Sequence, residues 1–384
     1  MKVGIVSFCD SRNNYGQLLQ CWALQQVLRK LGHVPYHIRY DYRAQRPGKL
    51  RQFLNDGLVK SLIHRVLHHK EISLNKHLRM QNAISDRQRD FEGFMTAHLA
   101  FAPEVYHSIE QLRNNPPQAE AYITGSDQVW SMLPEADYNK AFYLDFGDQK
   151  ALRLSYAASF GRSVYPAELL PVLRNLLSNF DGISVRENSG VDICAQAGAE
   201  AVLAVDPTLL LSDSDYKTLG SAQNEHASYV MIYSINIEHP EQMDWEGIRE
   251  YAGKLGLDVR CVSSTGHLPA REIFDGAIYS YPEIPQWISL VRSASMMFTT
   301  SFHGVVFSIL THTNFVYYPL EGKYSGGNSR VADLLAALSL EDHIWKHGMD
   351  YAKVQTPDWT EVDKRLDALR KSSIDFLNEK LTGR

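Results

Sequence analysis

The chain has 384 residues, of which 44% are hydrophobic and 22% are charged, and its formal net charge is −5. This composition is typical of a folded globular protein with room for two domains, and it excludes global disorder. The small negative charge gives no reason to expect nucleic acid as a partner.

Cysteine spacing and hydropathy exclude several further classes of protein. The four cysteines are far apart, and no CxxC or His/Cys ligand pair is present. We therefore predict reduced thiols in a cytoplasmic protein, with neither a disulfide framework nor a zinc site. No segment is apolar for long enough to cross a bilayer, and the short apolar N-terminus is typical of a buried strand rather than a signal peptide.

The N-terminal residues predict the fold class. Residues 3–8 are a short apolar run, and after a polar turn residues 17–32 carry apolar side chains at helical spacing. Residues 33–40 then form a second apolar run. A strand, a helix and a strand in this order predict a parallel sheet with right-handed crossovers.

The next segment, from about 46 to 118, has a helical pattern and is locally basic, so we predict a helical insert. Its cationic residues, among them Lys60, Arg65 and Arg79, suit peripheral contact with the inner face of a membrane, although a solvated helical face is the commoner explanation. Short apolar runs resume at 121 and continue to about 212, where the first domain closes.

Strand and helix patterns alternate afresh after a polar linker. We predict a second domain over 225–355, and an amphipathic helix over 358–384 that packs back onto the first domain, 1–212. The predicted fold is therefore α/β, with two doubly wound, Rossmann-like domains that face a cleft. Ligands of such sheets bind at the carboxyl ends of the strands, so functional residues should directly follow strands.

Two motifs follow predicted strands and suit anion or proton chemistry. His303 and Gly304 open a helix after strand 296–301, where we expect the free N–H groups of Gly304 and Val305 to attract an anion. A histidine that only caps this helix is the alternative. Arg186 ends the strand in ISVREN and suits a phosphate or carboxylate, or else forms a surface pair with Glu187.

Other candidates suit sugar hydroxyls or helix capping. Ser126 and Asp127 follow a strand in GSDQVW, where Asp127 is either a general base or an N-cap. Trp130 in the same motif is a candidate for stacking on a sugar, with a core position as the alternative. The remaining candidates are turn residues with equally good structural roles, namely Asn14, Tyr15, Gly16, Asp206, Asn328 and Arg330.

Seven motifs in one order resemble the polysaccharide pyruvyl transferase family. They are NNYGQLLQCWALQQVLRKLG, YITGSDQVW, LSYAASFG, ISVREN, VDPTLLL, TTSFHGVVFSIL and NSRVADLLAALSL, and they extend from about residue 1 to about 345. The resemblance implies a fold similar to a GT-B glycosyltransferase. It also implies an enzyme that transfers pyruvate from phosphoenolpyruvate to two hydroxyls of a sugar as a cyclic ketal.

The resemblance also assigns roles to residues. It implies that Ser301, Phe302 and His303 bind the donor and that Arg186 holds its anionic groups, with His303 as the candidate acid and Asp127 or Glu187 as the base. Family members resemble one another in an arginine two residues before the histidine, where this chain has Ser301. We expect Arg330 or another basic residue to supply that charge. No redox cofactor and no metal is expected.

Two other functions remain open from the sequence. The same architecture suits a GT-B glycosyltransferase with a nucleotide-sugar donor, although no clear ribose-binding acid follows a strand of the second domain. The serine at 301 also suits a glycan-binding homologue without catalytic activity. In each case the partner is a sugar or a lipid-linked oligosaccharide, in the cytoplasm or at the inner membrane face.

Overall fold

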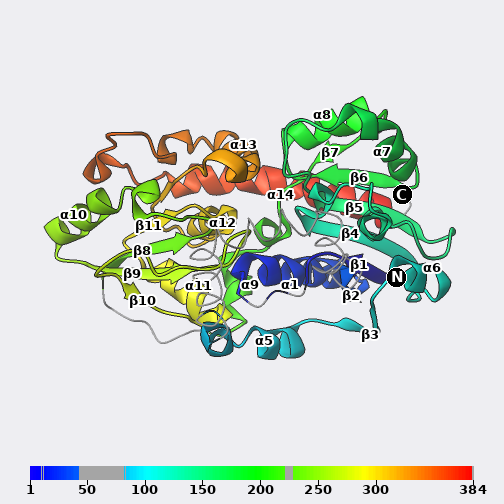
Figure 1. The fold of residues 1–384 in the computed structure, drawn as a ribbon, viewed down its shortest axis with the longest axis horizontal. Helices are drawn as coiled ribbons and strands as arrows, with labels where there is room; N and C mark the ends of the chain where they lie inside the picture. The colour runs from blue at the N-terminus through cyan, green and yellow to red at the C-terminus, as the bar shows by residue number, and fades with distance from the viewer. Residues whose placement is uncertain (10, 12, 43–81, 83, 221–227, 383–384) are drawn as a thin grey trace, which may run out of the picture.

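The computed structural model describes residues 1–382 apart from 10, 12, 43–81, 83 and 221–227. The chain forms two parallel sheets that lie side by side, each with helices against it, and this confirms the predicted α/β class (Figure 1). Within the described residues, no helix is long and apolar enough to cross a membrane. The basic residues Lys60, Arg65 and Arg79 of the predicted membrane-facing segment lie outside the described residues.

The first sheet has seven parallel strands in the order β3-β2-β1-β4-β5-β6-β7, which is the Rossmann order. Its strands are β1 (Lys2–Val6), β2 (Val34–Tyr40), β3 (Phe101–Tyr106), β4 (Ala121–Asp127), β5 (Leu152–Ala158), β6 (Gly182–Val185) and β7 (Val202–Leu203). The helices among them are α1 (Tyr15–Lys30), α5 (Phe91–His98), α6 (Ile109–Asn114), α7 (Leu170–Leu177), α8 (Asn188–Gln196) and α9 (Asp213–Lys217).

The second sheet has five parallel strands in the order β10-β9-β8-β11-β12, which repeats the same winding. Its strands are β8 (Tyr229–Ser234), β9 (Asp258–Ser263), β10 (Ile278–Tyr279), β11 (Met296–Thr299) and β12 (Phe315–Tyr317). The helices that accompany it are α10 (Trp245–Leu255), α11 (Ile284–Ser293), α12 (Phe302–Leu310) and α13 (Asn328–Leu338).

The last helix, α14 (Trp359–Thr382), extends along both sheets (Figure 1). Near its start, Asp363 pairs with His312 of the second domain at 3.0 Å. Farther along, the Ser373 hydroxyl accepts a hydrogen bond from the Val205 N–H, and Arg370 donates to the Leu209 carbonyl. The chain therefore returns to the first sheet after it has completed the second, so both ends of the sequence stabilise the first domain.

The helical insert predicted over 46–118 is wrong in part. Within it, β3 is a strand that extends the first sheet beyond β2. Pro103 and Glu104 weaken the strand pattern in the sequence, but an edge strand tolerates both because only one side of it is paired. The rest of the segment that is described is helical, as α5 and α6, and residues 43–81 lie outside the described part.

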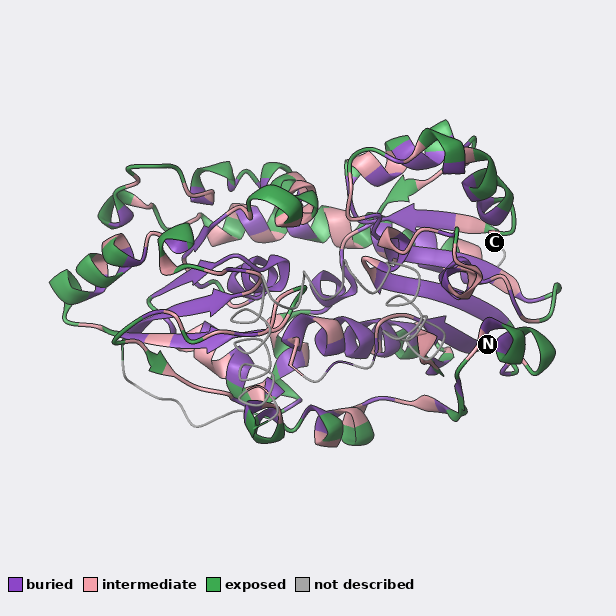
Figure 2. Ribbon diagram, in the orientation of Figure 1, coloured by how far each residue is buried: buried purple, intermediate pink, exposed green. Residues whose placement is uncertain are grey.

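The strands of both sheets are largely buried (Figure 2), and most of the buried side chains are apolar, as parallel strands covered on both faces require. One cluster of buried side chains joins the two domains through α1, α11 and α12. Tyr15 of α1 stacks on Trp287 of α11 with 5.0 Å between ring centroids, and its hydroxyl donates to the Pro282 carbonyl at 2.6 Å. These contacts hold the carboxyl ends of the two sheets opposite each other.

Candidate functional site

A cavity of 1690 Å³ lies where the carboxyl ends of the two sheets meet. Residues that follow β1, β2 and β4 line it from the first domain, and residues that follow β8, β9 and β11 line it from the second. This is the place where open α/β sheets bind their ligands. The polar side chains around His303 lie at one end of the cavity, against the start of α12.

His303 lies at that end, between the two domains. It is in the first turn of α12, which follows β11 after a break at Thr300 and Ser301. A Cβ atom added to Gly16 would lie 2.0 Å from the His303 Nδ1, so the imidazole packs directly against the start of α1. Gly16 therefore has a steric role that the sequence did not reveal: it leaves room for a histidine from the other domain.

The start of α12 differs in one detail from the prediction. The helix begins at Phe302, and the Val305 N–H donates to the Ser301 carbonyl at 3.1 Å, so it is not free for a ligand. The N–H groups of Phe302, His303 and Gly304 occupy the first turn, where a helix leaves donors without partners inside the helix. Gly304 fits closely against Thr299, because an added Cβ would lie 2.2 Å from the Thr299 hydroxyl.

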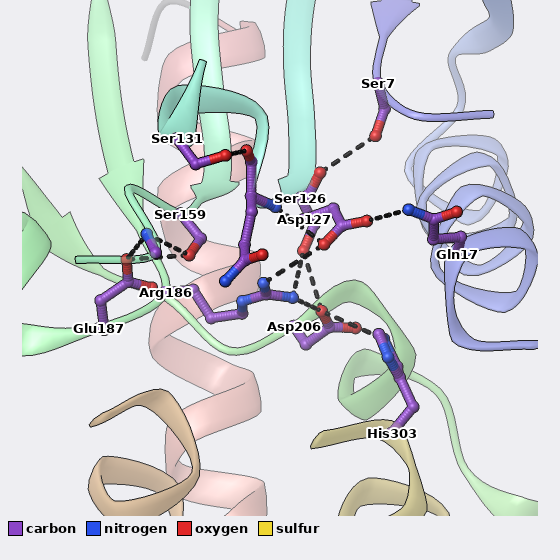
Figure 3. Close-up of polar contacts among 12 residues, drawn as sticks. Ser7, Gln17, Ser126, Asp127, Ser131, Ser159, Arg186, Glu187, Asp206 and His303 are labelled. Atoms are coloured by element: carbon purple, nitrogen blue, oxygen red, sulfur yellow. Dashed lines mark hydrogen bonds and ion pairs between the residues drawn. The ribbon is translucent and has the colours of Figure 1, made fainter. Parts of the chain in front are cut away.

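Asp206 is the centre of a buried polar network that faces His303 (Figure 3). Its carboxylate accepts hydrogen bonds from Arg186 Nη1 at 2.7 Å, from Ser126 Oγ at 2.9 Å, and from the Thr208 hydroxyl at 2.6 Å. The Nε2 atom of His303 lies 3.7 Å from Asp206 Oδ2. The network connects β4, β6 and the loop before the 3₁₀ turn Pro207–Leu210 to the histidine of the second domain.

The charge of Asp206 follows from this environment. Burial alone would raise the pKa of its carboxyl. His303, Arg186 and Thr208 lower that pKa by more than burial raises it, so the pKa lies well below its usual range. Asp206 is therefore ionised at neutral pH. The ionised carboxylate faces the Nε2 atom of His303, which has no hydrogen-bond partner among the described residues.

Arg186 holds this carboxylate rather than lining the cavity. Its guanidinium is buried, it binds Asp206 and Ser126, and its Nη2 lies 3.8 Å from Asp127 Oδ1. The Phe302 ring covers it, with 4.8 Å between the guanidinium carbon and the ring centroid. The prediction that Arg186 binds the donor directly is therefore wrong for this structure, because the buried carboxylate of Asp206 already pairs with its charge.

Arg330, unlike Arg186, lines the cavity. It lies in the first turn of α13, and its guanidinium carbon is 5.6 Å from the centre of the Phe302 ring, so this ring contacts both arginines. Its Nε atom is buried and has no hydrogen-bond partner among the described residues. Burial and the charge of Arg186 lower its pKa to about 10, against the opposing effect of Asp127 and Glu187, and it remains a cation at neutral pH.

Asp127 is the one carboxylate of GSDQVW, and it reaches the cavity from the end of β4. Its backbone is left-handed, with φ of 76°, and one carboxylate oxygen accepts from the N–H of Gln128 at 2.8 Å. The other accepts from the amide of Gln17 on α1 at 2.9 Å. The side chain is 13% exposed, so a ligand can reach a carboxylate that two neighbours already orient.

Glu187 does not reach the cavity, so its predicted role as a base is wrong. One of its carboxylate oxygens accepts from the Ser159 hydroxyl at 2.9 Å and from the N–H groups of Phe160 and Gly161 at 2.8 and 3.3 Å. The side chain is buried, and its other oxygen has no partner among the described residues. Glu187 holds the loop after β5 in place.

Most of the residues predicted to bind the acceptor have structural roles instead. Trp130 is fully buried, stacks on Tyr143 and donates its indole N–H to the Phe142 carbonyl, so it cannot stack on a sugar. Ser126 donates to Asp206 inside the network. Tyr15 is fully buried against Trp287, and Gly16 packs on His303, as described above. The predictions for these four residues are therefore corrected.

Asn14 and Asn328 each make a structural contact and also lie beside a cavity. Asn14 caps α1 by accepting from the Gln17 N–H at 3.3 Å, and it also lines the cavity. Asn328 uses its amide on the Tyr317 hydroxyl and on the backbone of Leu320, at the edge of a smaller cavity of 40 Å³ beside Arg330. Ser301, which replaces the expected arginine, is buried and lines the main cavity.

Sequence reasoning gave Asp206 as a candidate with a turn cap as the alternative, and it missed Gln17. Asp206 does cap the turn by accepting from the Thr208 N–H at 3.0 Å, and its other oxygen holds Arg186. Its position directly after a strand was the available signal. The sequence gives no signal for Gln17, because it looks like any other polar residue of a helix until the fold places Asp127 beside it.

The sequence was also compared with models of known protein families. The sequence matches the family model for polysaccharide pyruvyl transferases over residues 14–320, which is most of the chain. The chain belongs to the polysaccharide pyruvyl transferase family. It is accordingly an enzyme of this transferase family, and the matched range includes His303 and Asp206 as well as the first turn of α1, while Arg330 lies ten residues beyond it.

Solved structures with a similar course of the chain are distant in sequence. A putative UDP-N-acetylglucosamine 2-epimerase from Listeria monocytogenes is 11% identical, with a TM-score of 0.47 and coverage of 99% of this chain and 90% of that one. The UDP-GlcNAc 2-epimerase from Neisseria meningitidis, bound to UDP-GlcNAc, is 10% identical, with a TM-score of 0.47 and full coverage of both chains. Among curated proteins, no sequence matches this chain significantly.

Proposed function

We propose that this transferase moves the pyruvyl group of phosphoenolpyruvate to two hydroxyls of a sugar in a polysaccharide or a lipid-linked glycan precursor, and forms a cyclic ketal. One observation carries the proposal. Arg330, a cation without a partner among the described residues, lies in the same cavity as His303, at the start of α12. A donor with a phosphate and a carboxylate suits such a pair of anion-binding groups, because a helix start and an arginine each stabilise negative charge.

The proposed reaction moves one proton from His303 and one from each of the two sugar hydroxyls. In this scheme His303, which faces the ionised Asp206, gives a proton to the methylene carbon of the donor, and this leaves positive charge at the adjacent carbon. A sugar hydroxyl then adds to that carbon as its C–O bond to phosphate breaks, and the second hydroxyl closes the ketal. Of the two hydroxyl protons, one replaces the proton lost by the histidine and the other leaves with the phosphate.

Asp127 is the base that this scheme needs. It is the ionisable carboxylate of the predicted set that reaches the cavity, and Gln17 and Gln128 hold its two oxygens in place. No electrons are gained or lost overall, because each bond breaks and forms as an electron pair. The proposed reaction therefore uses no redox cofactor. Among the described residues, no three His, Cys, Asp or Glu side chains form a group that suits a metal ion.

Calorimetry with phosphoenolpyruvate tests the donor assignment. We expect the wild-type protein to bind phosphoenolpyruvate and Arg330→Ala to bind it at least 10-fold more weakly, because an arginine–anion contact contributes about 1.5–3 kcal/mol. Arg292→Ala is the matched control, since Arg292 pairs with Asp213 at 2.5 Å and does not line the cavity. Binding of UDP or GDP by the wild type, with no binding of phosphoenolpyruvate, would show instead that the donor is a nucleotide sugar.

A further inference from the structure

The cavity is larger than the proposed donor needs. Small-molecule sites usually enclose about 300–1,000 Å³, whereas this cavity has 1690 Å³. Its lining continues from Asp127 across the first sheet to residues at the ends of β1, β2 and β3. Strands β3, β2, β1 and β4 are direct neighbours, and at about 4.8 Å per step they span about 14 Å. The cavity is therefore much wider than one sugar ring.

The part beyond Asp127 contains aromatic side chains. Phe8, just after β1, and Tyr42, just after β2, both line the cavity and are half-buried. Their rings are 6.0 Å apart, and each meets the buried ring of Phe142 edge to face, at 5.1 and 5.6 Å. Phe142 thus supports two aromatic rings that line the open space. We call the part of the cavity around Phe8 and Tyr42 the aromatic arm.

The aromatic arm joins the catalytic end without a break. The Ser7 hydroxyl, next to Phe8, donates to the carbonyl of Ser126 at 3.0 Å, and Ser126 precedes Asp127. Charged residues of both signs also line the cavity, and some of them already bind protein groups, as Arg39 binds the Pro103 carbonyl and Asp86 pairs with Arg89. These charged residues are Arg39, Asp41, Asp86, Arg87, Asp90 and Glu92. Aromatic rings beside polar groups suit the apolar face and the hydroxyl edge of a sugar. A lipid chain would leave those charges without water.

We propose that the aromatic arm binds a second sugar unit of an oligosaccharide acceptor, so that the enzyme recognises a chain of sugars rather than a single residue. This inference rests on the proposed function for the reacting sugar at Asp127, and adds where the rest of the acceptor lies. Phe8 and Tyr42 are the stacking residues. The unit that reacts lies over β4, and the unit that is only recognised lies over β1 and β2.

Binding to a glycan array without donor tests the proposal separately from the reaction. The array carries monosaccharides to hexasaccharides of the common hexoses and N-acetylhexosamines. We expect the wild type to retain at least one oligosaccharide at least 10-fold more tightly than its terminal monosaccharide. Tyr42→Ala and Phe8→Leu should remove most of that difference, whereas Tyr42→Phe, which keeps the ring, should retain it. Arg292→Ala is the control for an unrelated side chain.

The outcomes are distinct from those of the donor experiment. If no oligosaccharide on the array binds more tightly than its terminal monosaccharide, the proposed role of the aromatic arm is wrong. This holds whether or not phosphoenolpyruvate binds. Equal binding by the wild type and by Tyr42→Ala and Phe8→Leu, with unchanged melting temperatures, also overturns the proposed role. If one of the two variants has a lowered melting temperature, the oligosaccharide preference of the other variant tests the proposal. This is possible because Phe8 and Tyr42 lie on separate loops after separate strands. Failure of phosphoenolpyruvate to bind removes the proposed reaction but leaves an oligosaccharide preference to be explained by the arm.

Discussion

The two ends of the cavity are built in opposite ways. Around His303, buried polar groups of the first domain hold one another, because Asp206 has four hydrogen bonds from Arg186, Ser126 and Thr208. The histidine, from the second domain, packs on Gly16. In the aromatic arm, half-buried rings and solvent-accessible charges surround an open space. The difference indicates that the first end needs fixed positions of a few atoms, whereas the second needs a broad surface of suitable chemistry.

The largest expected effect on this contrast comes from replacing His303, the proposed proton donor. We expect His303→Gln to lower kcat by about 10²–10⁴-fold, the usual contribution of a general acid. Its affinity for phosphoenolpyruvate should change less than 10-fold, because Arg330 remains in place. Release of phosphate, measured with donor and acceptor present, gives the rate. A variant with wild-type turnover would exclude His303 as the acid.

Substitution of the buried carboxylate has the next largest effect. We expect Asp206→Asn to lower the free energy of unfolding by about 3–5 kcal/mol, because Arg186 then keeps a buried charge without its partner. Since the folded state depresses the pKa of Asp206, its contribution to stability is present above the unfolded pKa of about 3.9 and is lost as the pH falls below it. Urea unfolding at pH 7 and below pH 4 measures both effects.

The asparagine variant provides its own internal test. Between pH 7 and pH 3 the wild type should lose stability more steeply than Asp206→Asn, since the variant has no carboxyl at this position to protonate. Parallel loss of stability in both proteins would mean that the ionised form of Asp206 contributes nothing. Activity should also decline in the variant, because the negative charge that faces His303 is gone.

A single methyl group tests how tightly the catalytic end is packed. Gly16→Ala should lower kcat about 100-fold, because the new Cβ would lie 2.0 Å from His303 Nδ1 and displaces the ring. Alanine favours a helix over glycine by about 1 kcal/mol, so α1 itself should not be weakened. Gly253→Ala in α10 is the matched control, as nothing lies within 4 Å of its added Cβ. Equal activity of the two variants would show that the histidine has room to move.

The sequence predicted the strand ends but not the contacts across the cleft. Periodicity located β1, β4, β11 and α12, because buried strands and amphipathic helices carry local patterns. It also placed His303 and Asp127 directly after strands. The role of Gly16 depends on how the two domains pack, and the roles of Arg186 and Asp206 depend on which loops of the first domain meet. No local pattern encodes either contact. The strand β3 was missed because Pro103 and Glu104 break its apolar pattern.

Trp130 gives the smallest predicted effect and sharpens the distinction between core and arm. The sequence suggested it as a sugar platform, yet it is fully buried between Tyr143 and Phe160. We expect Trp130→Phe to lower the free energy of unfolding by about 1–3 kcal/mol, through lost volume and the lost hydrogen bond to Phe142, without changing the oligosaccharide preference on the array. Tyr42→Ala should instead lower the oligosaccharide preference and change the free energy of unfolding less. The Tyr42 ring lines the cavity and contacts Phe142 only edge to face. If Trp130→Phe weakens oligosaccharide binding while Tyr42→Ala does not, then the acceptor does not use the aromatic arm, and recognition depends on how the buried core shapes the loop after β4.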